Sequence, residues 1–128
     1  MKNIRLEQID ESNFLDAFRL ELNPGQEAFV SHPIRSLAQA YVYRSQCMPF
    51  GVYCGTDMVG YVMVIYDWDE GCYNIWHMMI DRRHQRRGHG RAAIRAVLDF
   101  IRTKPFGDSE RVLLTCCREN ETAISLYR

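Results

Sequence analysis

Hydrophobic and polar positions in the first third of the chain follow a two-residue period and then a helical one. Residues 3–9 alternate apolar and polar side chains, which predicts a strand. Residues 12–22 and 36–46 carry apolar side chains three or four positions apart, which predicts two helices. Ser12 is the expected N-cap of the first helix. The apolar face expected for that helix consists of Phe14, Leu15, Phe18 and Leu22.

The rest of the chain shows mainly a strand pattern, with two further helices. Residues 50–54 and 58–66 predict two strands joined by a hairpin turn at Gly55-Thr56-Asp57. Residues 72–80 are apolar almost throughout, which is typical of a central strand covered on both faces. Beyond them the pattern predicts a helix over 88–104, a strand over 111–117 and a helix over 119–128. Because no repeat or linker interrupts this order, we expect residues 1–128 to form a single domain.

The composition of the 128 residues is that of a globular protein, with 47% hydrophobic and 25% charged side chains. A formal net charge of zero gives no overall attraction to nucleic acid or to a membrane, so we expect neither as a partner. The five cysteines are odd in number and have no CxxC spacing, which indicates reduced thiols in a cytoplasmic protein. Residues 1–10 lack the apolar core of a secretory signal. We also expect no bound metal.

Positive charge is concentrated in one segment. Residues 81–95 hold six arginines against one acidic residue, Asp81, whereas the remainder of the chain is acidic on balance. A local cationic patch on an otherwise acidic chain points to an anionic ligand. The six arginines are Arg82, Arg83, Arg86, Arg87, Arg91 and Arg95.

The same segment contains two glycines at the expected start of a helix. Gly88 and Gly90 are separated by one residue, so the backbone there can approach a ligand without interference from Cβ atoms. Unpaired N–H groups and the helix dipole favour an anion at such a start. Arg86, Arg87 and Arg91 add formal positive charge. These features predict a phosphate or pyrophosphate site.

Other phosphate-binding patterns fit this segment less well. Residues 88–93 match a GxGxxA dinucleotide fingerprint, but that fingerprint belongs directly after a strand, and seven polar or charged residues intervene here. A Walker loop is excluded because no Gly-Lys-Ser/Thr follows. No interleaved aromatic residues support nucleic-acid binding. A solvated, arginine-rich helix start without any ligand stays open as an alternative.

Two motifs together resemble those of the GNAT acetyltransferases. Gln85-x-x-Gly88-x-Gly90 resembles the family's Q/R-x-x-G-x-G/A motif, and residues 120–127 resemble its Asn-x-x-Ala-x-x-Leu-Tyr helix. The order of predicted elements also agrees over nearly the whole chain. The resemblance implies an α/β (α+β) fold in which a mixed, mostly antiparallel central sheet carries helices on both faces. It further implies transfer of an acetyl group from acetyl-CoA to a primary amine by direct attack in a ternary complex.

The resemblance implies roles for individual residues. Backbone groups of Met78, Met79 and Ile80 would hold the pantetheine arm, which Asn120 would also contact. Tyr127 would donate a proton to the leaving thiolate. The residues expected at the pyrophosphate are Gln85, Arg86, Arg87, Gly88, His89, Gly90 and Arg91. Plain structural roles stay open: Tyr127 and the two methionines as core side chains, and Asn120 as a helix cap.

The general base is the part of the family pattern that this sequence lacks. Some relatives place a glutamate on the fourth strand, but residues 74–77 contain no carboxylate. His77 is one candidate, although a histidine between large apolar residues also suits a structural role. The other candidates are a water held by the backbone and the acidic residues Asp67, Asp69 and Glu70.

The acceptor is indicated only by local pattern. Residues 76–81 and the last motif look like those of bacterial diamine and spermidine/spermine acetyltransferases, so a polyamine is the first amine to expect. A protein N-terminus, a lysine and an aminoglycoside are alternatives, and a catalytically weak acyl-CoA-binding regulatory domain is a second functional class. The family normally continues past Leu-Tyr with two more strands, so we expect a chain truncated after Arg128. Dimers are common among relatives, which makes a homodimer compatible with the resemblance.

Overall fold

The computed structural model describes residues 4–21, 33–85, 88–109, 111–114 and 122–125. Its strands are β1 (Ile4–Gln8), β2 (Cys47–Cys54), β3 (Asp57–Asp67), β4 (Cys72–Ile80), β5 (Arg111–Leu114) and β6 (Thr122–Ser125). Its helices are α1 (Phe14–Phe18), α2 (Pro33–Val42) and α3 (His89–Ile101), with a 3₁₀ turn at Arg82–His84.

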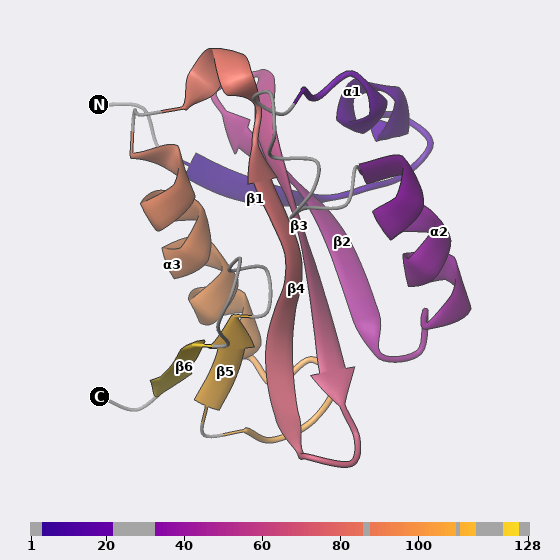
Figure 1. Ribbon diagram of the computed structural model, residues 1–128, viewed down its shortest axis with the longest axis vertical. Coiled ribbons are helices and arrows are strands. Elements are labelled where there is room, and N and C mark those ends of the chain that lie inside the picture. Colours follow the sequence, from indigo (N-terminus) through magenta and orange to yellow (C-terminus); the bar gives the residue numbers. More distant parts are fainter. Residues whose placement is uncertain (1–3, 22–32, 86–87, 110, 115–121, 126–128) are drawn as a thin grey trace.

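The strands form one six-stranded sheet in the order β1-β2-β3-β4-β5-β6. Every neighbouring pair is antiparallel except β4 and β5, which run parallel. Helices α1 and α2 cover one face of the sheet, and α3 covers the other (Figure 1). The predicted α/β (α+β) fold, a mixed and mostly antiparallel sheet with helices on both faces, is confirmed.

The hairpin between β2 and β3 forms where the sequence predicts it. Cys54 pairs with Asp57, so the turn itself consists of Gly55 and Thr56. Gly55 has a φ of +66°, a left-handed conformation that glycine adopts without steric cost. The prediction is confirmed, with Asp57 belonging to the strand and not to the turn.

Alternating side chains of β3 separate two hydrophobic cores. Val62 and Val64 belong to the core that contains the buried residues of α3, whereas Tyr61 and Met63 belong to the core beneath α1 and α2. The buried residues of α3 are Ala93, Val97 and Ile101. Because both faces of the central strands are covered, β4 is apolar along almost its whole length, as the sequence indicated.

The first predicted helix is shorter than expected and buries a different face. Within α1, Ala17 is buried, and Leu20 is buried just beyond it. Phe14 and Leu15, which were expected to face the core, are 36% and 52% exposed. A helix of little more than one turn cannot present an extended apolar stripe, so the small Ala17 side chain makes the close contact instead.

Both early helices also begin at other residues than predicted. Asn13, not Ser12, precedes α1, and the Ser12 hydroxyl donates a hydrogen bond to Asp10 Oδ1 at 2.6 Å. Helix α2 begins at Pro33 and ends at Val42, so it starts before the predicted residue 36. Proline suits this first helical position because its φ is already helical and no N–H is lost from the helix.

Residues 122–125 form a strand where the sequence predicts a helix. β6 pairs antiparallel with β5, with Ile124 opposite Val112 and Ala123 opposite Leu113. Two of its four residues are β-branched, which favours an extended backbone. The pairing also gives main-chain partners to the edge of β5. The helix predicted over 119–128 is therefore wrong for these four residues, and its other residues lie outside the described ones.

Candidate active site

Among the described residues, the last five residues of β4 have no strand partner on the side of β5. β4 pairs with β5 at three positions, the last of which is Ile75 opposite Leu114. From Trp76 to Ile80, no described strand lies on that edge of β4. An extended ligand that carries amide groups can add to such an edge as an extra strand. Met78, Met79 and Ile80, the residues predicted to hold the pantetheine arm, all lie in this stretch.

A β-bulge marks the start of this stretch of β4. Met63 of β3 pairs with His77, and Val64 pairs with Ile75, so Trp76 is an extra residue in β4. The bulge brings the rings of Trp76 and His77 into a stack, with centroids 4.8 Å apart and an interplanar angle of 17°. Tyr43, just after α2, lies edge-on to Trp76 at 6.0 Å.

His77 belongs to a buried polar cluster between the sheet and α2. Ser36 Oγ lies 2.7 Å from His77 Nδ1 and 2.7 Å from the hydroxyl of Tyr61. Ser36 and Tyr61 are fully buried, and His77 is 7% exposed. Burial lowers the pKa of His77 to about 4 and raises the pKa of Tyr61. Both side chains are therefore neutral at neutral pH. The sequence singled out His77, but not Ser36 or Tyr61, which are distant in the chain and belong to no motif.

A glycine turn leads from β4 into α3. Gly88 is exposed, has a φ of +79°, and precedes α3 without any side-chain cap. Apart from the adjoining residues of the chain, no described atom lies within 4 Å of the position that a Cβ on Gly88 would take. A Cβ on Gly90 would lie 3.9 Å from Ile80 Cγ1 and 4.0 Å from Met78 Cε. The start of α3 therefore packs beside the end of β4, and its first amides have the geometry that suits an anion.

A groove runs from Gly88 along the surface of α3. It has a volume of about 470 Å³ and is lined by Gly88, Arg91, Arg95 and Asp99 among other residues. Arg91 and Arg95 are both exposed on this helix. Of the predicted pyrophosphate residues, Gly88, His89, Gly90 and Arg91 thus lie together at the helix start, whereas Arg86 and Arg87 lie outside the described residues.

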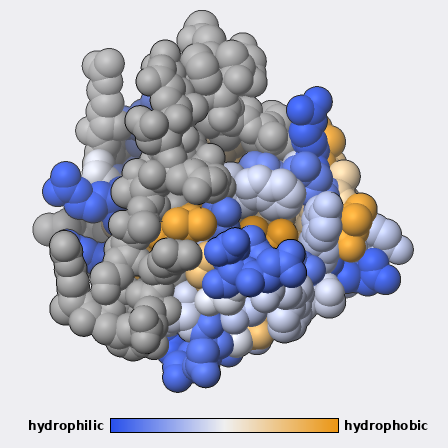
Figure 2. All heavy atoms as spheres, turned by 60° about the horizontal axis from the view of Figure 1, so that its bottom comes forward, coloured by the Kyte–Doolittle hydropathy of each residue, from blue (hydrophilic) through white to orange (hydrophobic). Residues whose placement is uncertain are grey.

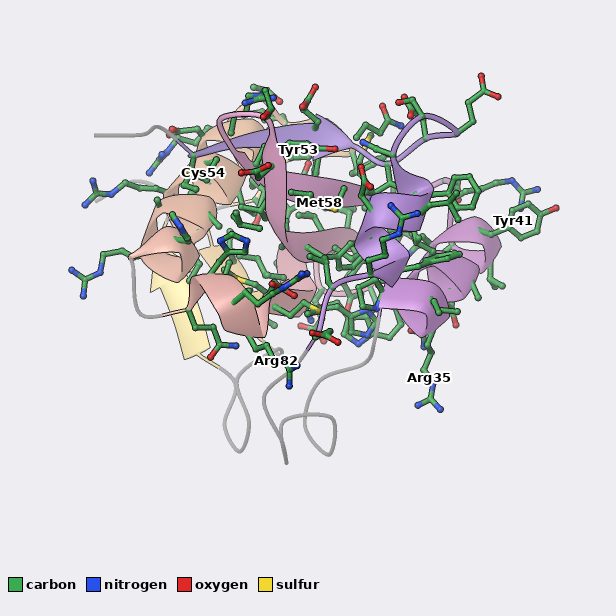
Figure 3. All side chains as sticks on the ribbon, turned by 90° about the horizontal axis from the view of Figure 1, so that it is seen from above. Arg35, Tyr41, Tyr53, Cys54, Met58 and Arg82 are labelled. Atoms are coloured by element: carbon green, nitrogen blue, oxygen red, sulfur yellow. The ribbon has the colours of Figure 1, made fainter. Side chains whose placement is uncertain are left out.

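Asp81 anchors the segment between β4 and α3. Its carboxylate is fully buried and accepts hydrogen bonds from Glu21 N at 2.7 Å and Arg83 Nε at 2.8 Å. Burial works to raise the pKa of Asp81, but the hydrogen bonds from Arg83 and Glu21 outweigh it and lower the pKa. Arg82, which is labelled in Figure 3, begins the 3₁₀ turn after β4 and forms an ion pair with Glu21 at 3.1 Å. Two arginines of the cationic segment thus have acidic partners within the protein.

The Gln85 side chain connects the end of this segment to β4. Its Nε2 donates a hydrogen bond to the carbonyl of Ile80 at 2.8 Å. This bond ties the loop back to the end of β4. Gln85, predicted as a pyrophosphate residue from its motif, therefore shapes the loop through its amide group. Sequence reasoning missed the matching role of Asp81, although a lone acid among six arginines was a signal for it.

The acidic cluster of the sequence lies far from His77. Asp67 Oδ1 accepts hydrogen bonds from the backbone N–H groups of Asp69 and Glu70, which shapes the β3–β4 turn. Five residues of strand, or roughly 16 Å, separate the start of β4 at Cys72 from His77. The turn lies at the bottom of Figure 1, the end that comes forward in Figure 2, where much of the described surface is hydrophilic. The structure removes these three acids from the candidate bases.

The remaining predicted site residues, Asn120 and Tyr127, lie outside the described residues. Within the described part of the chain, no group of three or more His, Cys, Asp or Glu side chains is arranged to hold a metal ion. None of the helices described there has the length and apolar character needed to cross a membrane.

The glycine-led start of α3 and the neighbouring edge of β4 suit a phosphate-bearing ligand with an extended arm, and they lie on a mixed sheet with helices on both faces. The sequence profile of the Acetyltransferase (GNAT) family matches residues 13–128. The chain therefore belongs to the GNAT acetyltransferases, which are acetyl-CoA-dependent acyltransferases, and the resemblance noted in the sequence is confirmed. A comparison with curated protein sequences gives no match.

Solved structures share this fold at low sequence identity. A Salmonella typhimurium acetyltransferase that modifies the N-terminal serine of a 50S ribosomal subunit protein superposes with a TM-score of 0.65 at 14% identity, over 88% of this chain and 70% of that one. A chimeric spermidine N-acetyltransferase of Vibrio cholerae SpeG and hSSAT gives 0.65 at 16% identity, over 88% and 69%. An Elizabethkingia anophelis GNAT acetyltransferase with acetyl-CoA bound gives 0.57 at 14% identity, over 88% and 64%.

Proposed function

We propose that this chain moves the acetyl group of acetyl-CoA onto a primary amine, with His77 as the general base. The observation that carries the proposal is the position of His77, which lies at the bulge of β4, two residues beyond its last described pair with β5. Because burial lowers its pKa to about 4, the ring is neutral at neutral pH and keeps the lone pair that a base needs.

The chemistry needs a base, a donor for the carbonyl oxygen and an acid. Acetyl-CoA supplies the acetyl thioester. An alkylamine is mostly protonated at neutral pH, so its neutral fraction is the nucleophile. As the new N–C bond forms, the nitrogen becomes acidic and His77 takes the proton that it loses, directly or through a water. The backbone N–H of Met78 stabilises the negative charge that develops on the carbonyl oxygen. As the C–S bond breaks, Tyr127 gives its proton to the leaving thiolate.

The features of this chain fit the two ends of the co-substrate. The edge of β4 at Met78, Met79 and Ile80, where no described strand pairs, suits the amide groups of the pantetheine arm, with the Ile80 carbonyl already held by Gln85. The open left-handed turn at Gly88 and the first amides of α3 suit the pyrophosphate. In this proposal Arg86, Arg87, His89, Gly90 and Arg91 line the pyrophosphate, Gln85 shapes the loop around it, and Asn120 contacts the arm.

A polyamine such as spermidine is the finer hypothesis for the acceptor. The fold similarity to the chimeric spermidine N-acetyltransferase supports it at the level of fold only. The described side chains that contact His77, namely Ser36 and Trp76, carry no charge, and the acidic turn lies at the other end of β4. Spermidine therefore needs to be compared with acceptors that have a single amine.

The test is an acetylation assay on purified protein with acetyl-CoA and spermidine, a monoamine or a peptide with a free N-terminus. We expect CoA release together with a mass increase of one acetyl group on at least one amine. His77→Gln is expected to lower kcat by about 100-fold without a change in the Kd for CoA. Tyr127→Phe should likewise lower turnover far more than CoA affinity. Tight CoA binding without turnover on any amine would support the acyl-CoA-binding regulatory domain instead.

A further inference from the structure

We infer that Ser36 is a positioning residue that holds His77 in the tautomer with its hydrogen on Nδ1, so that Nε2 receives the proton of the amine. Tyr61 and Met63 complete this arrangement around the Ser36 hydroxyl. The inference rests on the proposed function of His77 as the general base. It adds which ring nitrogen accepts the proton and which side chains determine that choice.

The geometry places three groups around one hydroxyl. Ser36 Oγ lies 2.7 Å from His77 Nδ1, 2.7 Å from Tyr61 OH and 3.7 Å from Met63 Sδ. The partners come from β3 and β4, while Ser36 lies on the sheet-facing side of α2. Because Ser36, Tyr61 and Met63 are fully buried, bulk water does not compete for these hydrogen bonds.

The hydrogens of this cluster can be assigned by counting. A serine hydroxyl has one hydrogen and two acceptor lone pairs. Within the described residues, the buried Tyr61 hydroxyl contacts only Ser36, so the phenol hydrogen points to Ser36 Oγ. The single hydrogen of Ser36 then has two destinations, His77 Nδ1 or Met63 Sδ.

The two destinations differ in how many hydrogen bonds they allow. If Ser36 donates to Nδ1, the His77 hydrogen sits on Nε2, which has no hydrogen-bond partner within the described residues, and the cluster contains two bonds. If Ser36 donates to the sulfur of Met63, its oxygen accepts from both Tyr61 and Nδ1–H, and three bonds form. The three-bond arrangement pairs every hydrogen of the cluster within the protein and leaves a lone pair on Nε2. Because Nδ1 faces Ser36, the proposed base needs this lone pair on Nε2, so the Nδ1–H tautomer is the one that fits the proposed function.

Trp76 supplies the second constraint on the His77 ring. Its indole stacks on the imidazole at 4.8 Å, with the two planes 17° apart. The stack limits rotation of the imidazole about its Cβ–Cγ bond, because that rotation would tilt the ring away from the indole. The Ser36 contact determines which edge of the ring faces α2. A base whose orientation and tautomer are already set avoids the cost of ordering them during the reaction.

The tautomer can be measured directly by NMR on protein with ¹⁵N-labelled histidine rings, because the two ring nitrogens resonate differently according to which one carries the hydrogen. We expect the Nδ1–H form for His77, assigned by the loss of its signals in His77→Gln. Ser36→Ala removes the acceptor for Nδ1–H and is expected to bring in the Nε2–H form and to lower kcat by about tenfold, with the Kd for CoA unchanged.

Met63→Leu is the sharper variant because it nearly conserves side-chain volume and removes only the sulfur acceptor. The Ser36 hydrogen should then turn to Nδ1, so we expect the Nε2–H form to appear and kcat to fall about tenfold. Met58→Leu, on the same strand but outside the cluster, is the matched control and should behave like the wild type.

The results separate this inference from the proposed function. An Nε2–H form in the wild-type protein, or an Nδ1–H form that persists in Met63→Leu, overturns the role given to Ser36 and its partners. The same change of tautomer in Met58→Leu would also overturn it, since the effect would not be specific to the sulfur. Full turnover by His77→Gln would instead refute His77 as the base and leave the tautomer measurement valid.

Discussion

Trp76 and His77 are consecutive residues of β4, yet their rings stack at 4.8 Å with planes 17° apart. Consecutive side chains of a regular strand point to opposite faces, so the stack depends on the bulge at Trp76. The bulge comes directly after Ile75, the last residue of β4 that pairs with β5. One irregularity therefore brings His77 toward α2, directly beyond the last described pair between β4 and β5.

The stability of the protein is predicted to depend on pH through His77. Because its pKa falls from 6.5 to about 4 on folding, the unfolded chain binds a proton in this range that the folded chain does not. This contribution, at most about 3 kcal/mol, is complete above about pH 6.5 and is lost as the pH falls toward 4. Urea unfolding at pH 7 and pH 5 should show a smaller loss of stability for His77→Gln than for the wild type. Equal losses in the two proteins would contradict the prediction.

Gly90→Val is expected to abolish CoA binding and leave the fold intact. The nearest protein atoms to a Cβ at this position are 3.9 and 4.0 Å away, which are ordinary contacts. The added side chain would instead fill the space through which a pyrophosphate reaches the first amides of α3. Calorimetric titration with CoA and thermal unfolding measure the two properties. Thr103→Val, beyond the C-terminal end of α3, is the control, and unchanged CoA affinity in Gly90→Val would count against the loop.

Gly60→Ala is expected to destabilise the protein by about 2 kcal/mol. A Cβ at this position would lie 2.5 Å from the carbonyl oxygen of Met79 and 2.8 Å from Ile80 Cδ1, so β3 and β4 would have to separate. The separation would occur at the end of β4, and CoA affinity should fall with stability. Chemical denaturation provides the measurement, and Gly90→Ala, whose Cβ meets only ordinary contacts, is the matched control for stability alone. Wild-type stability in Gly60→Ala would show that the strands adjust without cost.

Gln39→Met is expected to raise the free energy of unfolding by about 1 kcal/mol. Within the described residues, Gln39 Oε1 is a buried oxygen without a hydrogen-bond partner. Gln39 lies three residues after Ser36 and four before Tyr43, on the same side of α2. Methionine has a similar length and helix propensity but no oxygen to leave unpaired. A lower midpoint of urea unfolding in this variant would disprove the reasoning.

The parts of the fold that the sequence predicted well depend on local patterns. The β2–β3 turn needed a residue able to take a positive φ, and Gly55 supplied it. The start of α3 was visible in Gly88 and in the regular spacing of Ala93, Val97 and Ile101. The strand at Thr122–Ser125 could not be predicted in this way, because its conformation comes from pairing with β5.

In the candidate site, too, local patterns predicted one part, and the other part depended on the folded chain. The motif around Gly88 identified the anion-binding helix start, since glycine content, charge and helix onset are all local properties. It did not reveal that Arg82 and Arg83 pair with Glu21 and Asp81, because those contacts need the folded chain.

By itself, the sequence determined the order of strands and helices up to β5, the glycine-led helix after the fourth strand and the family to which the chain belongs. Each of these follows from residue type and spacing along a short stretch. Only the tertiary structure decided the bulge at Trp76, the end of the described β4–β5 pairing at Ile75 and the contact between Ser36 and His77. These features arise from strand register and from packing between residues that lie 41 positions apart in the case of Ser36 and His77, and no local pattern encodes them.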